Sequence, residues 1–221
     1  MPAHVQLCPI ELPGHGTRFS EPLIDKVDHL IASLVRDILP ILDCPFFVFG
    51  HSLGALLGFE FSRHLVQKHD LTPDRLVVSG RRAPHKKSPP PLRHTLPDQQ
   101  LIDNLTKLGG MPDGLAEDRD LMRLMLPILR ADFRLTELYE GNISSPLPFP
   151  MTAIVGDNDP EVSVPEMHSW QDVRPESFSL HPFVGDHFYL LQPEARRNLI
   201  LLICQHINLQ GRLSDTALHA Q

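Results

Sequence analysis

The residues best suited to covalent chemistry lie in the segment Gly50-His51-Ser52-Leu53-Gly54. A serine hydroxyl becomes a nucleophile when a base takes its proton and a third group holds that base in place. His187 is the candidate base and Asp159 is the candidate acid that would orient it. Serine, then aspartate, then histidine is a chain order that predicts a serine hydrolase.

The neighbours of Ser52 indicate how it is positioned. Residues 46–49 are an apolar run typical of a buried strand, and a helical pattern starts at Ala55. A sharp strand-to-helix turn strains the backbone at Ser52, and we expect side chains at positions 50 and 54 to collide with the neighbouring elements. The turn places the hydroxyl at a helix N-terminus, where N–H groups favour negative charge. A structural turn without chemistry is the alternative reading of this segment alone.

Position selects His187 from the 13 histidines of the chain. It follows the last predicted strand, at residues 177–183, and Asp159 follows the predicted strand at 151–156. The carboxyl ends of parallel strands are where open α/β sheets build their sites. We therefore expect both residues to lie at the same edge as Ser52.

Two other acidic residues compete for the orienting role. Asp157 is the rival acid, but we favour Asp159 because it precedes Pro160 and lies further into the loop. Asp186 is adjacent to His187 and is expected to point elsewhere.

Strands and helices alternate along the chain, which predicts a mostly parallel sheet with right-handed crossovers and helices on both faces. Asp25 is the expected N-cap of the first helix. The predicted strands are residues 5–12, 46–49, 75–79, 151–156 and 177–183, and a closing helix is predicted at 193–207. The predicted organisation is a hydrolase core at 1–96 and 150–210, a helical insert at 97–149 and a frayed tail at 211–221.

The insert is expected to be a lid. Its apolar residues repeat at helical spacing on two segments, and Pro127 is expected to kink the second. The two predicted faces are Leu101, Leu105 and Leu108, then Leu121, Leu124, Met125, Ile128 and Leu129. A helical block above the active edge of a sheet can control access to the site. The alternative is a small subdomain that only covers the core.

Composition restricts the partners and the compartment. The chain has 221 residues and a net charge of −7, which argues against nucleic acid as the main partner. An acidic carrier protein would need a local basic patch, which Arg81-Arg82, Lys86-Lys87 and Arg93 could supply, or these residues form a solvated loop. No metal spacing, signal peptide or membrane-spanning run is found, and three scattered cysteines suit a reducing cytoplasm. We expect a monomer without a cofactor.

Six segments resemble the type II thioesterases of polyketide and nonribosomal peptide assembly lines, within the α/β-hydrolase superfamily. They read Leu-Pro-Gly-His-Gly-Thr-Arg at 12–18, Gly-His-Ser-Leu-Gly-Ala at 50–55, Ser-Gly-Arg-Arg-Ala-Pro at 79–84, Leu-Arg-Ala-Asp-Phe at 129–133, Gly-Asp-Asn-Asp-Pro at 156–160 and Gly-Asp-His-Phe-Tyr-Leu at 185–190. The resemblance implies hydrolysis of acyl groups from the phosphopantetheine arm of a carrier protein, and an editing role. It also implies that the Leu53 N–H is one oxyanion donor.

The resemblance further implies a strand and a Gly-rich loop before the Pro13-Gly14 segment, which would supply a second oxyanion donor. Only Met1 and the segment Pro2-Ala3-His4 precede the predicted strand at 5–12, so we expect the functional polypeptide to begin upstream of Met1. Two other functions stay open: a carrier-protein acyltransferase, since Gly-His-Ser-Leu-Gly also occurs in malonyl transferases, and a carrier-binding protein with little turnover.

Overall fold

A computed structural model describes residues 4–111, 114–141, 143, 147–174 and 176–218, with side chains described up to Ile207. The chain divides into two compact units. Residues 11–187 form the larger unit, which holds the whole sheet and all three candidate catalytic residues. The first ten residues and residues 188–221 form the smaller one.

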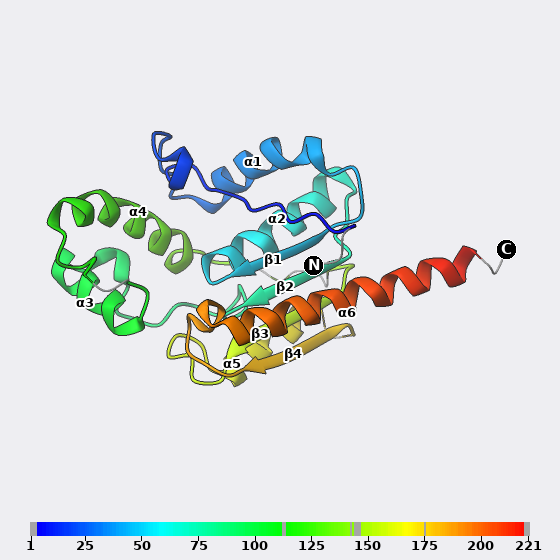
Figure 1. Cartoon of the computed structure of the whole chain (residues 1–221). Helices are drawn as coiled ribbons and strands as arrows, with labels where there is room; N and C mark the ends of the chain where they lie inside the picture. Colours follow the sequence, from blue (N-terminus) through cyan, green and yellow to red (C-terminus); the bar gives the residue numbers. More distant parts are fainter. Residues whose placement is uncertain (1–3, 112–113, 142, 144–146, 175, 219–221) are drawn as a thin grey trace. The chain divides into compact units, whose positions relative to one another are not determined.

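The larger unit is built on a four-stranded parallel sheet (Figure 1). Its strands are β1 (Phe47–His51), β2 (Arg75–Ser79), β3 (Met151–Gly156) and β4 (Phe178–Phe183), in spatial order β1-β2-β3-β4. All six residues of β3 are buried, as is typical of an inner strand of a parallel sheet. Four of the five predicted strands, those at 46–49, 75–79, 151–156 and 177–183, correspond to these parallel strands.

The strand predicted at residues 5–12 is wrong, because no part of it is assigned as a strand. Two prolines, Pro9 and Pro13, lie in or beside it and have no N–H to donate to a neighbouring strand. An extended segment becomes a strand only when another strand pairs with it.

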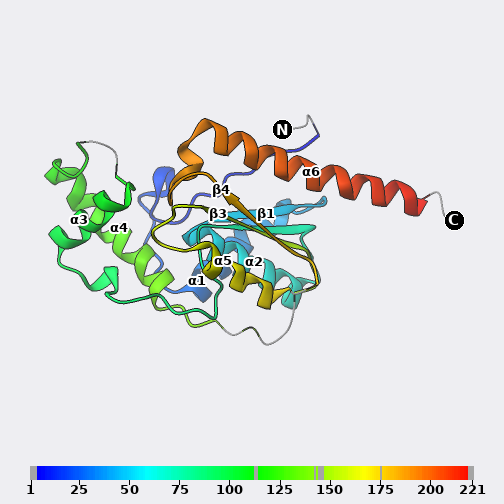
Figure 2. The same cartoon turned by 90° about the horizontal axis from the view of Figure 1, so that it is seen from below.

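Three helices of the larger unit lie on the same face of the sheet (Figure 2). They are α1 (Val27–Ile38), α2 (Leu53–His69) and α5 (Val164–His168). Lys26, not Asp25, is the N-cap of α1 and makes no side-chain capping bond. The Asp25 carboxylate instead lies 3.2 Å from the Arg134 guanidinium of the helical insert, so the predicted cap is an inter-element ion pair.

The insert consists of α3 (Asp98–Leu108) and α4 (Arg119–Glu137), which lie beyond the carboxyl edge of the sheet (Figure 1). α4 continues through Pro127 as one helix. Its buried residues are Met122, Ile128 and Leu135. Leu121 and Leu124, which were predicted to share a face with Ile128, are 37% and 52% exposed. Only part of the predicted apolar face of α4 is therefore buried.

Polar contacts attach the C-terminal half of α4 to the core. Nε2 of His15 lies 3.1 Å from a carboxylate oxygen of Asp132, and the buried Arg81 guanidinium donates to the Thr136 carbonyl at 3.0 Å. The Tyr139 hydroxyl, just after the helix, donates to the buried Glu60 carboxylate of α2. This end of the insert is thus held by three segments of the core, one of which is the helix that follows Ser52.

The smaller unit contains a short turn of helix at Tyr189–Leu191 and α6 (Pro193–Leu218). α6 passes position 207, where the closing helix was expected to end, and includes most of the predicted frayed tail. The sequence from 212 to 218 has no proline, and its Arg, Leu and Ala residues favour helix.

Candidate active site

Ser52 occupies a strained turn between β1 and α2. Its φ of 52° and ψ of −114° are rare for a residue with a side chain. A Cβ at Gly50 would lie 1.9 Å from the main-chain oxygen of Gly54, so only glycine fits there. The expected collision at Gly54 is wrong, because a Cβ at that position would meet nothing within 4 Å. One of the two motif glycines is therefore sterically required for the turn.

The helix that follows Ser52 offers main-chain donors. Leu53 is the first residue of α2, and the first four N–H groups of a helix have no intrahelical acceptor. The Ser52 N–H is already used, since it donates to the Ser79 carbonyl at 2.8 Å. The Leu53 N–H is thus the nearest main-chain group with the chemistry of an oxyanion donor.

His187 and Asp159 form a buried pair. Nδ1 of His187 lies 2.9 Å from Oδ2 of Asp159, and both side chains are almost fully shielded from solvent. The other Asp159 oxygen accepts from the N–H groups of Glu161 and Val162 at 2.7 and 3.3 Å. With the carboxylate as acceptor, Nδ1 carries the proton, and Nε2 is the ring atom that can act as a base.

Asp157 has a different set of contacts. One of its oxygens accepts from the Gly185 N–H at 3.0 Å and from the Asn158 side-chain amide at 2.8 Å. The Asn158 N–H in turn donates to the Gly185 carbonyl at 3.0 Å. Asp157 therefore connects the loop after β3 to the turn before His187, and the imidazole is paired with Asp159.

His51, the last residue of β1, contacts the ring of His187. The rings of His51 and His187 have centroids 4.9 Å apart, and Nδ1 of His51 lies 2.8 Å from the Ser79 hydroxyl. Burial, and then the charge of His187, lowers the pKa of His51 to about 4. Since Ser52 follows His51 directly, this ring contact brings the start of the serine turn close to the His187–Asp159 pair.

Sequence reasoning missed two residues of this site, His51 and Gly80. Gly80 has a φ of +60°, and a Cβ there would lie 2.5 Å from the His51 ring and 3.3 Å from the His187 ring. Their positions could have indicated both residues. His51 directly precedes the candidate nucleophile, and Gly80 follows the predicted strand at 75–79, within the Ser-Gly-Arg-Arg segment.

Most side chains of the proposed basic patch form ion pairs or hydrogen bonds with other residues of this chain. Arg93 makes a two-pronged ion pair with Glu161 at 2.5 Å, and Arg82 lies 3.3 Å from the carboxylate of Glu166. Arg81 is buried, which lowers its pKa to about 10. Lys86 and Lys87 are exposed, and Lys87 pairs with Glu140. These residues form neither an open cationic patch nor a simple solvated loop.

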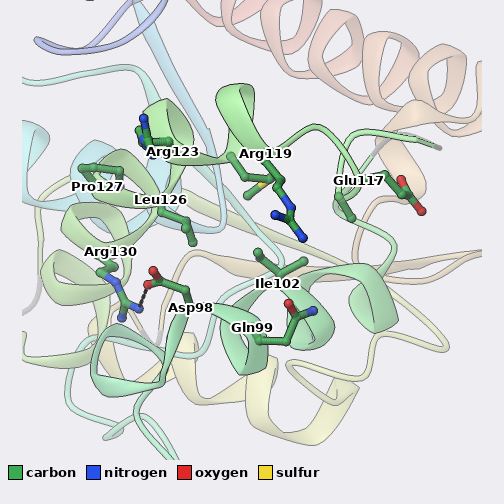
Figure 3. A pocket seen from close by; sticks show the side chains of 11 residues that line it. Asp98, Gln99, Ile102, Glu117, Arg119, Arg123, Leu126, Pro127 and Arg130 are labelled. Atoms are coloured by element: carbon green, nitrogen blue, oxygen red, sulfur yellow. Dashed lines mark hydrogen bonds and ion pairs between the residues drawn. The ribbon is translucent and has the colours of Figure 1, made fainter.

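A separate pocket of about 750 Å³ lies between α3 and α4 (Figure 3). Arg130 and Asp98 form an ion pair on its wall at 2.5 Å, and Ile102 and Leu126 point into it. None of Ser52, Asp159 and His187 lines it. It is a feature of the insert and not of the candidate active site.

Within the part of the chain that is described, no group of three or more His, Cys, Asp or Glu residues could hold a metal ion. Among the helices that the structure describes, we find no segment with the length and apolar composition that a membrane span requires.

The thioesterase-domain family matches residues 1–207 of this chain. The chain belongs to the thioesterase family. Among curated relatives of this thioesterase, gramicidin S biosynthesis protein GrsT of Aneurinibacillus migulanus is 34% identical, over 94% of this chain and 80% of GrsT. Linear gramicidin dehydrogenase LgrE of Brevibacillus parabrevis is 38% identical, over 86% of this chain and 73% of LgrE.

Solved structures agree with the sequence relatives. ClbQ, from the colibactin NRPS/PKS pathway, superposes with a TM-score of 0.88 at 28% identity, covering 96% of this chain and 90% of ClbQ. RedJ, a thioesterase of prodiginine biosynthesis in Streptomyces coelicolor, gives 0.83 at 32% identity, covering 90% and 78%. The predicted α/β-hydrolase fold, the resemblance to type II thioesterases and the class of thioester hydrolase are confirmed.

Proposed function

We propose that this thioesterase hydrolyses acyl groups from the phosphopantetheine arm of acyl or peptidyl carrier proteins. In this role it removes stalled or mis-primed units from a polyketide or nonribosomal peptide assembly line. The relatives named above and YbtT, a type II thioesterase of the yersiniabactin NRPS/PKS pathway, support the link to such assembly lines. The observation that carries the catalytic proposal is the buried His187–Asp159 pair beside the strained serine turn.

In the proposed acylation, the Ser52 oxygen attacks the thioester carbonyl carbon while Nε2 of His187 takes the hydroxyl proton. Asp159 holds the ring and stabilises the imidazolium that forms. The carbonyl oxygen becomes an oxyanion that the Leu53 N–H stabilises. The carbon–sulfur bond then breaks, His187 returns the proton to the sulfur, and the carrier leaves as a free thiol.

Deacylation uses the same groups in the same order. Water attacks the acyl–Ser52 ester and loses a proton to Nε2 of His187. Collapse of the intermediate releases the carboxylic acid and gives the proton back to the Ser52 oxygen. Because a thiolate is a good leaving group, acylation asks less of His187 as an acid than amide cleavage does.

We assign the choice of acyl chain to the helical insert. Its position beyond the carboxyl edge of the sheet is the place from which a lid can cover Ser52 (Figure 1). The exposed leucines of α4, Leu121 and Leu124, are apolar groups available to an acyl chain.

The test is an assay of acyl carrier protein loaded with short, medium and long acyl groups, with Ser52→Ala as the control. Release of free acid by the wild type and not by the variant supports the proposal. Transfer of the acyl group to a second carrier or thiol would support an acyltransferase. Binding of the loaded carrier without any product would support a binding protein, and either result would overturn hydrolysis.

A further inference from the structure

The ring of His51 stands between the end of β2 and the turn that carries His187. Its Nδ1 lies 2.8 Å from the Ser79 hydroxyl, and its centroid lies 4.9 Å from that of the His187 ring, with the planes inclined by 47°. His51 and Ser79 are also partners in the β1–β2 register. The two residues are therefore joined through both main-chain pairing and side chains, which fixes the His51 ring relative to the sheet.

Gly80 closes the space beside both rings. A Cβ there would lie 2.5 Å from Cε1 of His51 and 3.3 Å from Cε1 of His187. The Gly80 N–H donates to the Ile154 carbonyl of β3 at 3.0 Å, so this main chain is itself anchored. Both imidazoles thus lie against one anchored segment of backbone.

His51 keeps a neutral ring in this position. Burial is the main reason why its pKa lies near 4, and the neighbouring His187 acts in the same direction. Asp159 and a hydrogen bond with the His187 main chain act in the opposite direction and are weaker. A neutral neighbour matters, because a cation at this distance would oppose the imidazolium that His187 must form.

One hydrogen bond does not fix an imidazole. The bond from Nδ1 of His187 to Asp159 defines one point of the ring, and the ring can still tilt about that bond. A contact on the flank of the ring removes this freedom. The flank contact comes from the residue directly before Ser52, so the position of the base is tied to that of the nucleophile.

We propose that His51 is a positioning residue for the catalytic base, holding the His187 ring in the orientation that presents Nε2 to Ser52. The inference rests on the proposed function. His51 takes no proton in the reaction and acts through His187 alone. Its flat side chain supplies the contact, and Ser79 holds that side chain in place.

The experiment compares His51→Ala, which removes the contact, with His51→Phe, which keeps a flat ring but loses the Ser79 bond. For hydrolysis of an acyl thioester, we expect His51→Ala to lower kcat about 10- to 100-fold with KM changed less than about twofold, the scale of a misplaced catalytic group. His51→Phe should retain most of kcat. His64→Ala, at a partly exposed histidine on α2, is the matched control and should behave as wild type.

Two further measurements separate positioning from folding. The acid limb of the kcat/KM profile reports the base, and in His51→Ala it should shift, whereas a uniform loss of folded protein would leave its midpoint unchanged. Thermal unfolding shows how much of each variant is folded at the assay temperature. Ser79→Ala removes the same bond and leaves the His51 ring in place, so, like His51→Phe, it should retain most of kcat, and it should add little in His51→Phe, because the bond is already absent there.

The proposal is overturned if His51→Ala keeps the wild-type kcat and pH profile, or if its loss follows the folded fraction alone. Equal losses in His51→Ala and His51→Phe would also contradict it, because the flat ring would then not be the active feature. Ser52→Ala separates a failure of the proposed function from a failure of the role proposed for His51. If that variant is active, the proposed function itself is wrong, whereas an inactive Ser52→Ala with a fully active His51→Ala overturns only the role of His51.

Discussion

Nδ1 of His187 donates a hydrogen bond to the Asp159 carboxylate at 2.9 Å. Asp157, two residues before Asp159, accepts a hydrogen bond from the Gly185 main-chain N–H at 3.0 Å. Two carboxylates in one loop, Asp159 and Asp157, thus have different hydrogen-bond partners. The first orients an imidazole, and the second joins two loops. The difference gives each a distinct expected response to the same substitution.

Asp159→Asn should reduce kcat by about 10⁴-fold, the loss that follows the same change in serine proteases, because an amide can favour the wrong imidazole tautomer. Asp157→Asn should cost less than about tenfold, since the oxygen of an asparagine can still accept from the Gly185 N–H. Steady-state hydrolysis of an acyl thioester by the two variants provides the comparison. Equal losses, or a larger loss in Asp157→Asn, would contradict the assignment of Asp159.

The two glycines of the serine turn should respond differently to alanine. Gly50→Ala places a methyl group 1.9 Å from a main-chain oxygen, so we expect loss of activity and a lower free energy of unfolding. Gly54→Ala has open space and lies within α2, where alanine favours helix, so its free energy of unfolding should rise by up to about 1 kcal/mol. Urea unfolding followed by circular dichroism measures both. A destabilised Gly54→Ala would show that the open space is filled in solution.

Acid should destabilise the protein partly through His51. Its pKa is about 4 in the folded chain and 6.5 in ordinary surroundings, so the unfolded chain binds more protons between these values. Stability therefore rises with pH across this window and falls as the pH is lowered from 6.5 towards 4. The contribution lost is roughly 3 kcal/mol. Unfolding free energies of wild type and His51→Phe at pH 7 and pH 5 should show a smaller pH dependence in the variant, and identical slopes would refute the depressed pKa.

The contact between Tyr139 and Glu60 should stabilise the junction between the insert and α2. Tyr139→Phe removes the hydroxyl that donates to a buried carboxylate, so the free energy of unfolding should fall by about 1–3 kcal/mol. Lys87→Ala breaks an ion pair between two exposed side chains and should change stability by less than about 1 kcal/mol. Both are measured by chemical denaturation. A Tyr139→Phe variant as stable as Lys87→Ala would mean that water replaces the lost donor.

Acyl-chain preference should respond to the exposed leucines of α4. Leu124→Ser removes an apolar side chain that is 52% exposed, and we expect the ratio of kcat/KM for long over short acyl chains to fall several-fold. Arg123→Ser changes the adjacent residue, which lines the separate pocket between α3 and α4, and should leave the ratio unchanged. An unaltered ratio in Leu124→Ser would remove this residue from the acyl-binding surface.

Most of the sheet, and the candidate order of serine, aspartate and histidine, could be predicted from the sequence. The strands at 75–79 and 151–156 were predicted with the bounds that the structure has, because parallel inner strands are continuous apolar runs. The serine turn could be predicted because its features lie close together in the sequence. They are a strand, a glycine at a position where a backbone contact leaves no room for a side chain, and a helix. The choice of Asp159 and His187 also came from position, since both follow strands that end at one edge.

Features that depend on residues far apart in the chain could not be predicted from local sequence patterns. Residues 5–12 have an apolar composition, but no described strand pairs with them. Asp25 was expected to cap a helix and instead pairs with Arg134, and Arg93 was expected in a cationic patch and is bound by Glu161. His51 acquires its neutral ring and its contact with His187 only when three strand ends and Gly80 come together. Local propensity fixes where an element can form, whereas charge pairing, burial and ring contacts depend on which surfaces folding brings within a few ångströms.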